Sequence, residues 1–309
     1  MSEPSSTVVL RVPPLGAELH DDVAERHTAV DAPHDDVEAI VCTNSGRVDD
    51  ALIAALPGLR VICNHGVGYD NIDLEACRAR GIAVSNTPEV LDAAVAETAL
   101  GLLLATVRRL PQADRFVREE RWAEGAFPLT AQVSGSRVGI VGLGRIGTAL
   151  AELLAAMGCT VGYHNRREVA GSPFTYHPRL VDLAAAVDAL VLVVPGGPGT
   201  AGLVGAEVLD ALGPDGVLVN VARGSVVDEG ALITALAEGR LGAAGLDVYA
   251  DEPHVPAALR AMEQVVLLPH VGSATRPTRA AMRELTLRNL DTFLRTGSLV
   301  TPVPELASH

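Results

Sequence analysis

Short apolar runs alternate with segments of helical periodicity along most of the chain. Runs of this length, bounded by glycine, proline and polar residues, predict buried strands of a parallel sheet. The predicted strands are Val8 to Val12, Ala39 to Thr43, Arg60 to Cys63, Ile82 to Ser85, Val138 to Val141, Thr160 to Tyr163, Ala189 to Val194, Val217 to Val221, Ala243 to Leu246 and Val265 to Leu268. The predicted helices include Val48 to Leu56, Ile72 to Arg80, Glu89 to about Arg109, Pro111 to Trp122 and Arg276 to Arg295, whereas Val169 to Pro178 is irregular. Such alternation of strand and helix indicates an α/β fold.

One strand–turn–helix unit in the middle of the chain carries the pattern Gly142-x-Gly144-x-x-Gly147. A strand precedes the glycines, and apolar residues from Ile146 to Met157 recur at helical spacing after them. The glycines allow a tight turn, close approach of the backbone to a pyrophosphate, and close packing of helix on strand. The N-terminus of the helix then offers free N–H groups to phosphates. The unit therefore predicts a dinucleotide-binding site.

The position of this unit predicts the domain organisation. A chain of 309 residues favours two domains, and a long helix follows the last strand. The simplest arrangement returns that helix to the first domain. We therefore predict an α/β fold of two Rossmann-like or flavodoxin-like, doubly wound parallel-sheet domains, with an active-site cleft between them. Residues 1–100 plus 277–309 would form a discontinuous substrate-binding (catalytic) domain, and residues 101–276 the NAD(P)-binding Rossmann domain.

Composition excludes several classes of function. The chain has 24 basic and 38 acidic residues, for a formal charge of -14, so we expect no nucleic acid or anionic membrane surface as a partner. All the basic residues are arginine, which excludes a Schiff-base lysine, a P-loop lysine and a catalytic lysine.

The location of the protein is predicted from its cysteines and its apolar segments. The four cysteines show no CxxC spacing, so we expect buried thiols in a reducing compartment and no metal site. The stretch Ala93 to Val107 is too short to span a membrane and contains Glu97. No signal sequence is visible at the N-terminus, and we expect a cytoplasmic protein.

Polar side chains that suit catalysis follow three of the predicted strands. Arg223 lies just after the first of these strands, Asp247 follows the second with Asp251-Glu252 beyond it, and His270 follows the third. Ligands of open parallel sheets bind outside the carboxyl ends of the strands, so these groups are expected at one edge of the dinucleotide sheet. Any one of them could be structural, but the three together indicate an active site.

Reduction of a 2-oxo acid by a nicotinamide requires these three groups. Arginine can hold the substrate carboxylate in a forked contact and polarise the carbonyl group. Histidine titrates near neutrality and can donate the proton that the carbonyl oxygen needs. A carboxylate behind the histidine would fix its tautomer and stabilise the imidazolium.

Two further segments bear on the ligands. NAD sites place a carboxylate about 20 residues after the first glycine, but here Asn165, Arg166 and Arg167 occupy that zone. The arginines suit the 2′-phosphate of NADP(H), with NAD left open because both could be surface residues. The glycine loop Asn64 to Asn71 could hold the substrate carboxylate on its N–H groups, or be an ordinary turn.

Nearly the whole chain resembles the D-isomer-specific 2-hydroxyacid dehydrogenases, and within them the glyoxylate/hydroxypyruvate and hydroxyphenylpyruvate reductases. The stretches that carry the resemblance are His65 to Asp73, Val84 to Pro88, Arg137 to Gly147, Asn220 to Asp228, Gly245 to Tyr249 with Glu252-Pro253, and Pro269 to Thr275.

The resemblance implies an NADPH-dependent reductase of glyoxylate, hydroxypyruvate or an aryl-pyruvate. It implies that Arg223, Glu252 and His270 are catalytic, with His270 as proton donor. Substrate would contact the Val67 and Gly68 amides together with Arg223 and His270. The implied cofactor contacts are Gly142, Leu143, Gly144, Arg145, Ile146, Gly147, Asn165, Arg166, Arg167, Val221, Ala222 and, at the nicotinamide end, Asp247. Members of the family are typically homodimers with Glu89 to Arg109 near the contact, and Trp122 is a candidate for reaching the partner's site.

Other members of the family leave alternatives open. A phosphoglycerate dehydrogenase would share this core, and formate and phosphite dehydrogenases share the scaffold. A different class of relative binds NAD(H) as a transcriptional corepressor. Fold alone cannot separate these functions. The complete catalytic trio favours an enzyme.

Overall fold

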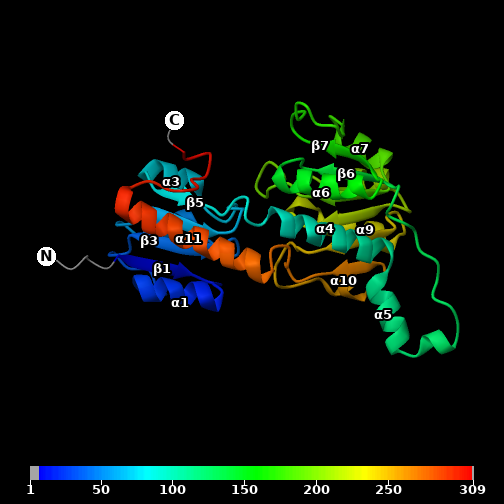
Figure 1. Ribbon diagram of the computed structural model, residues 1–309, viewed down its shortest axis with the longest axis horizontal. Coiled ribbons are helices and arrows are strands. Elements are labelled where there is room, and N and C mark those ends of the chain that lie inside the picture. Colours follow the sequence, from blue (N-terminus) through cyan, green and yellow to red (C-terminus); the bar gives the residue numbers. More distant parts are fainter. Residues whose placement is uncertain (1–6, 308–309) are drawn as a thin grey trace. The chain divides into compact units, whose positions relative to one another are not determined.

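The computed structural model describes residues 7–307, and the chain forms two compact units (Figure 1). Of the described residues, 7–91 and 275–307 form the first unit, and 92–274 form the second. Each unit holds one parallel sheet with helices packed on it, so the predicted fold class of two doubly wound α/β domains is confirmed.

The first unit is built on a five-stranded sheet with the order β2-β1-β3-β4-β5, which is the flavodoxin-like order. Its strands are β1 (Val8–Val12), β2 (Thr28–Val30), β3 (Ala39–Thr43), β4 (Val61–His65) and β5 (Ala83–Ser85). Its helices are α1 (Ala17–Arg26), α2 (Asp50–Ala54), α3 (Leu74–Arg80) and the long α11 (Arg276–Thr296). Residues of β3 and β4 are buried on both sheet faces, as their continuous apolar sequence requires.

The second unit has a seven-stranded sheet with the order β12-β11-β10-β9-β6-β7-β8, a Rossmann order extended by one strand. Its strands are β6 (Arg137–Val141), β7 (Thr160–His164), β8 (Thr175–Tyr176), β9 (Ala189–Leu192), β10 (Val217–Asn220), β11 (Ala243–Leu246) and β12 (Val265–Leu267). Its α-helices are α4 (Asp92–Val107), α5 (Leu110–Arg118), α6 (Arg145–Ala156), α7 (Leu180–Ala186), α8 (Ala206–Leu212), α9 (Glu229–Ala237) and α10 (Ala257–Ala261). Short 3₁₀ turns cover Arg121–Ala123 and Gly224–Val226.

Side-chain caps fix the beginnings of several helices. Asp49, Asp73 and Asp228 accept from the amide three residues on, at the starts of α2, α3 and α9. Thr275 caps α11 in the same way, and Gly297 ends that helix in the left-handed conformation. These contacts satisfy backbone groups that a helix end leaves unpaired, which is why the helices begin and end at these residues.

The boundary between the units falls after Leu91, earlier than the boundary after residue 100 that the sequence predicts. The physical reason is that α4 packs on α6 and on strands β10, β11 and β12 of the second unit. Helix α4 also begins at Asp92 rather than at the predicted Glu89. Glu89 has a φ of 71° and therefore cannot lie in a right-handed helix. The second boundary falls at Thr275, just before α11, rather than after residue 276.

Other elements also differ from the sequence prediction. The segment Val169 to Pro178, predicted to be irregular, contains the two-residue strand β8, which pairs with β7 at the edge of the sheet. The first helix and β2 were not predicted. The polar helix from Pro111 ends at Arg118, and a separate 3₁₀ turn contains Trp122. No helix among residues 7–307 has the length and apolar character needed to span a bilayer.

Candidate active site

The glycine-rich turn connects β6 to α6 in the geometry that a dinucleotide site needs. Gly142 lies in the left-handed region with a φ of 104°, and Gly144 caps α6. A Cβ at Gly147 would lie 2.1 Å from the carbonyl oxygen of Gly142, so the helix packs directly on the turn. A Cβ at Gly144 would meet nothing within 4 Å, which leaves the backbone there open to a phosphate. These residues therefore fit a bound dinucleotide.

The residues that follow β7 hold this turn in place and add two arginines next to it. The Asn165 side-chain oxygen accepts from the amide of Leu143 at 2.7 Å, which ties the end of β7 to the turn. Arg166 and Arg167 follow it and are exposed. Arg145, at the start of α6, forms an ion pair with Asp92 of α4 at 3.4 Å. A rigid turn thus lies beside two accessible guanidinium groups.

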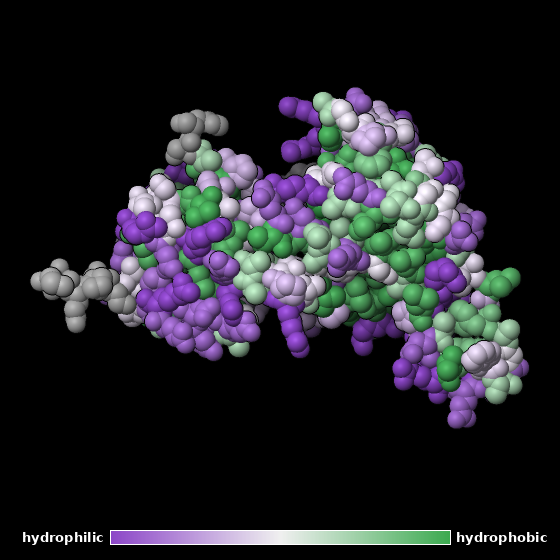
Figure 2. Space-filling model, in the orientation of Figure 1, coloured by the Kyte–Doolittle hydropathy of each residue, from purple (hydrophilic) through white to green (hydrophobic). Residues whose placement is uncertain are grey.

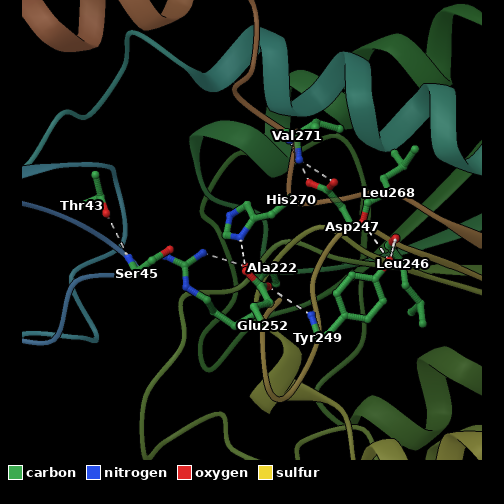
Figure 3. A network of polar contacts seen from close by, with 12 residues as sticks. Thr43, Ser45, Ala222, Leu246, Asp247, Tyr249, Glu252, Leu268, His270 and Val271 are labelled. Carbon is green, nitrogen blue, oxygen red and sulfur yellow. Dashed lines mark hydrogen bonds and ion pairs between the residues drawn. The ribbon is translucent and has the colours of Figure 1, made fainter. Parts of the chain in front are cut away.

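The predicted imidazole and carboxylate form a close pair at the carboxyl ends of β11 and β12. Figure 3 shows His270 pointing at Glu252, with Nδ1 of the histidine 2.7 Å from one carboxylate oxygen. The other carboxylate oxygen accepts from the amide of Tyr249 at 3.1 Å. Burial by itself raises the pKa of Glu252, but the hydrogen bond and charge of His270, the Tyr249 amide and the charge of Arg223 outweigh it and lower this pKa. Glu252 is therefore a carboxylate, and Nδ1 donates to it.

Asp247 holds the turn that carries the imidazole. Its carboxylate is 1% exposed and accepts from the amides of Val271 at 2.7 Å and Gly272 at 2.8 Å. Its carbonyl oxygen accepts from the amide of His270, whose φ of 54° is uncommon for a residue other than glycine. Burial raises the pKa of Asp247, against the effect of both amides. The contact of Asp247 with a nicotinamide stays a prediction.

Arg223 follows β10, one strand away from β11 in the sheet. The side-chain amide of Asn220 donates to the carbonyl of Arg223 at 2.9 Å, and its oxygen accepts from the amide of Ala222 at 3.0 Å. The guanidinium itself donates to the carbonyl of Ala222 at 2.8 Å. Asn220 thus fixes the backbone that carries Arg223, a role that reasoning from the sequence missed although the residue ends a strand. Val221 and Ala222, predicted to line the cofactor, are buried in this turn.

The glycine loop of the first unit follows β4 and exposes two backbone donors. Asn64 donates to the carbonyls of Gly66 at 3.1 Å and Gly68 at 2.9 Å, and Asn86 donates to the carbonyl of Val67 at 2.8 Å. Within residues 7–307, no protein group accepts from the amides of Val67 and Gly68. The loop therefore has fixed carbonyls and available N–H groups, as an anion-binding loop requires. Neither supporting asparagine was predicted.

His65, the last residue of β4, makes the free energy of unfolding depend on pH. The imidazole is 7% exposed, and burial together with the charges of Arg279 and Arg283 lowers its pKa to about 4. The unfolded chain binds this proton near pH 6.5, so the free energy of unfolding must fall as pH drops from about 6.5 to 4. The loss attributable to His65 is up to about 3 kcal/mol.

Urea unfolding at pH 7.5 and 4.5 tests this expectation. Wild type should lose more stability between the two values than a His65→Gln variant, whose amide can still contact Thr286 but does not titrate. Equal losses in the two proteins would contradict the assignment of this pH dependence to His65.

The remaining sequence predictions concern metal ions and thiols. Within the described part of the chain, no group of three or more histidine, cysteine or acidic residues could hold a metal ion. The four cysteines are free and buried, as predicted. Burial raises the pKa of the Cys63 thiol to about 12 and that of Cys77 to about 11, so these thiols are unreactive near neutral pH.

Comparison with known proteins gives consistent matches. The family described as D-isomer specific 2-hydroxyacid dehydrogenase, NAD binding domain, matches residues 100–272. A glyoxylate/hydroxypyruvate reductase A of Arabidopsis thaliana is 47% identical over 279 residues, covering 90% of this chain and 89% of the relative. A hydroxyphenylpyruvate reductase of Plectranthus scutellarioides is 46% identical over 267 residues, covering 86% and 85%. The crystal structure of an NADPH-dependent glyoxylate/hydroxypyruvate reductase of Sinorhizobium meliloti, in complex with NADP and malonate, superposes with a TM-score of 0.93 at 46% identity and 98% coverage of both chains.

Proposed function

The chain belongs to the D-isomer specific 2-hydroxyacid dehydrogenase family, and from this premise we propose that it reduces a small 2-oxo acid to the D-2-hydroxy acid with NADPH. The substrates in view are glyoxylate, hydroxypyruvate and aryl-pyruvates, which the relatives' names support. The observation that carries the proposal is the His270–Glu252 pair at 2.7 Å, at the edge of a sheet that also carries a dinucleotide turn. NADPH, when bound, supplies the hydride that reduces the keto carbon.

His270 is the proton donor in this proposal. Glu252 is a carboxylate that accepts from Nδ1, so Nε2 is the ring nitrogen that transfers a proton to the carbonyl oxygen. The negative charge of Glu252 also stabilises the imidazolium before transfer. The backbone turn held by Asp247 keeps the imidazole in one orientation.

Arg223 and the glycine loop bind the substrate in this proposal. The guanidinium of Arg223 polarises the carbonyl and contacts the carboxylate through its forked donors. The available amides of Val67 and Gly68 hold the carboxylate. The support for these roles is that Asn220, Asn64 and Asn86 fix the backbone on which these donors lie.

Cofactor binding is assigned to the turn and to the residues after β7. The backbone from Gly142 to Gly147 and the N-terminus of α6 would hold the pyrophosphate. The exposed Arg166 and Arg167 would pair with the 2′-phosphate, which explains a preference for NADPH over NADH. Asn165 positions both arginines by its bond to Leu143.

An oxidation assay tests the proposal. NADPH and, separately, NADH are supplied with glyoxylate, hydroxypyruvate and 4-hydroxyphenylpyruvate, and loss of the reduced cofactor is followed by absorbance. We expect turnover with NADPH, and an Arg166→Gln/Arg167→Gln variant should raise KM for NADPH about tenfold to a hundredfold while leaving KM for NADH nearly unchanged. Turnover with NADH alone would show that the arginines are surface residues. Tight cofactor binding without turnover would instead favour a corepressor-like sensor.

We extend the proposal to a homodimer in the cytoplasm. The segment from α5 to residue 129 extends away from the sheet of the second unit (Figure 1). Figure 2 shows apolar and polar residues side by side on it. Its exposed apolar residues are Leu110 (50%), Val117 (54%), Trp122 (69%) and Leu129 (101%). Large apolar side chains exposed on a projecting segment favour an interface between proteins, and the proposal requires a dimeric mass by light scattering. The four free thiols suit a reducing compartment.

A further inference from the structure

Helix α11 extends past the carboxyl end of β4 in the first unit. Near the start of the strand, the Arg60 guanidinium lies 5.6 Å from the centre of the Phe293 ring. At its end, Nδ1 of His65 lies 3.2 Å from the hydroxyl of Thr286. The helix therefore runs antiparallel to β4, and residues before Thr286 lie beyond the strand end, where the glycine loop begins. Arg279 precedes Thr286 by two turns, or about 10 Å along the axis.

Arg279 lies on the helix face that packs toward the strand end. Residues 279, 282, 283 and 286 follow the helical spacing that places side chains on one face. Thr286 contacts His65 on this face, and Met282 is 1% exposed. Helical side chains tilt toward the N-terminus, so the guanidinium of Arg279 is directed further along the edge of the sheet.

The charge of Arg279 has no partner among residues 7–307. Arg283, on the same face, forms ion pairs with Glu18 and, at 3.2 Å, with Asp22. No group in the described part of the chain forms an ion pair or hydrogen bond with Arg279. Its charge contributes to the lowered pKa of His65, which places it near the strand end, and burial lowers its own pKa. The side chain of Arg279 is exposed, so its five N–H donors are open to a ligand that supplies acceptors.

Resting on the proposed function, we propose that Arg279 is a specificity-determining residue that binds an oxygen atom on the substrate chain beyond the keto carbon. The amides of Val67 and Gly68 hold the carboxylate just after His65, and Arg279 extends over the same edge of the same sheet. The enzyme therefore prefers a 2-oxo acid with a hydroxyl group at C3 over one with an alkyl group of the same size. Glyoxylate has no such chain and does not use Arg279.

The test compares hydroxypyruvate with 2-oxobutyrate, in which a methyl group replaces the hydroxyl, and with glyoxylate. Arg279→Met should lower the ratio of kcat/KM for hydroxypyruvate to that for 2-oxobutyrate by about tenfold or more. Its kcat/KM for glyoxylate should stay within about threefold of wild type. Arg288→Met is the matched control. It removes the same charge from α11, but Arg288 is exposed on the opposite face of the helix.

Four outcomes overturn the inference. An equal loss with all three substrates would assign Arg279 to the shared carboxylate or to the fold. An unchanged ratio, or the same change in Arg288→Met, would show that Arg279 does not select the chain. A wild-type protein that reduces none of these acids would reject the proposed function itself, and the inference with it, before any variant is made.

Discussion

A His270→Gln variant is expected to bind NADPH as wild type does and to lose about 10²–10⁴-fold in kcat, the range that a general acid contributes. Glutamine keeps a polar side chain within reach of Glu252, but it cannot deliver a proton at neutral pH. The cofactor turn lies between β6 and α6, and Asn165, not His270, accepts from the amide of Leu143 in it. Steady-state kinetics with hydroxypyruvate, together with NADPH titration by fluorescence, separates the two effects.

His254→Gln is the control for this substitution. His254 lies two residues after Glu252, its side chain is 79% exposed, and it pairs with Asp251 at 3.6 Å. It should keep wild-type kinetics, because an exposed ion pair contributes little. Turnover within about threefold of wild type in His270→Gln would remove this residue from proton transfer and leave the proposed mechanism without its acid.

The place of the proposed catalytic groups could be predicted because it depends on topology. Parallel strands β10, β11 and β12 are neighbours, so residues that follow them share one edge of the sheet. Alternating apolar runs identify such strands, and the residues after them, Arg223 and His270 among them, are then candidates. The glycine-rich turn could be predicted in the same way, because the sequence shows a strand pattern before it and a helical pattern after it.

The choice between two carboxylates could not be predicted from spacing. Asp247 directly follows β11, yet both of its oxygens accept from the backbone of residues 271 and 272, which leaves it buried. Glu252 reaches His270 instead, because the chain between Tyr249 and Glu252 folds back on itself. The conformation of this loop decides which carboxylate contacts the imidazole. From the sequence, only the resemblance to a family assigned that role to Glu252.

The unit boundary and the smallest strand also depend on contacts distant in sequence. A Cβ at Gly245 would lie 2.5 Å from the hydroxyl of Thr106, so α4 packs directly against β11 of the second sheet. Neither the apolar character of α4 nor its length shows which sheet it covers. The strand β8 exists because residues 175 and 176 pair with β7, and two residues carry no periodic signal of their own.

Replacing Gly224 by alanine is expected to lower kcat/KM at least about 100-fold, because the substitution moves two parts of the proposed catalytic site. A Cβ at this position would lie 1.9 Å from the carbonyl carbon of Tyr249 and 2.4 Å from the amide nitrogen of Ala250. One of the two backbones must therefore move by more than an ångström. Gly224 adjoins Arg223, and the amide of Tyr249 holds Glu252 at 3.1 Å. A displacement of about 1 Å at a catalytic group costs about 100-fold in rate.

Gly230→Ala is the matched control, since a Cβ in this helical position of α9 would meet only Asp228, at 3.4 Å. Alanine is favoured over glycine inside a helix by about 0.5–1 kcal/mol, so this variant should be active and at least as stable as wild type. Thermal unfolding and NADPH binding, measured beside kcat/KM, show whether Gly224→Ala remains folded. A folded Gly224→Ala enzyme with activity near that of wild type would mean that Arg223 and Glu252 tolerate the shift. Their proposed roles would then not depend on the positions in which the structure holds them.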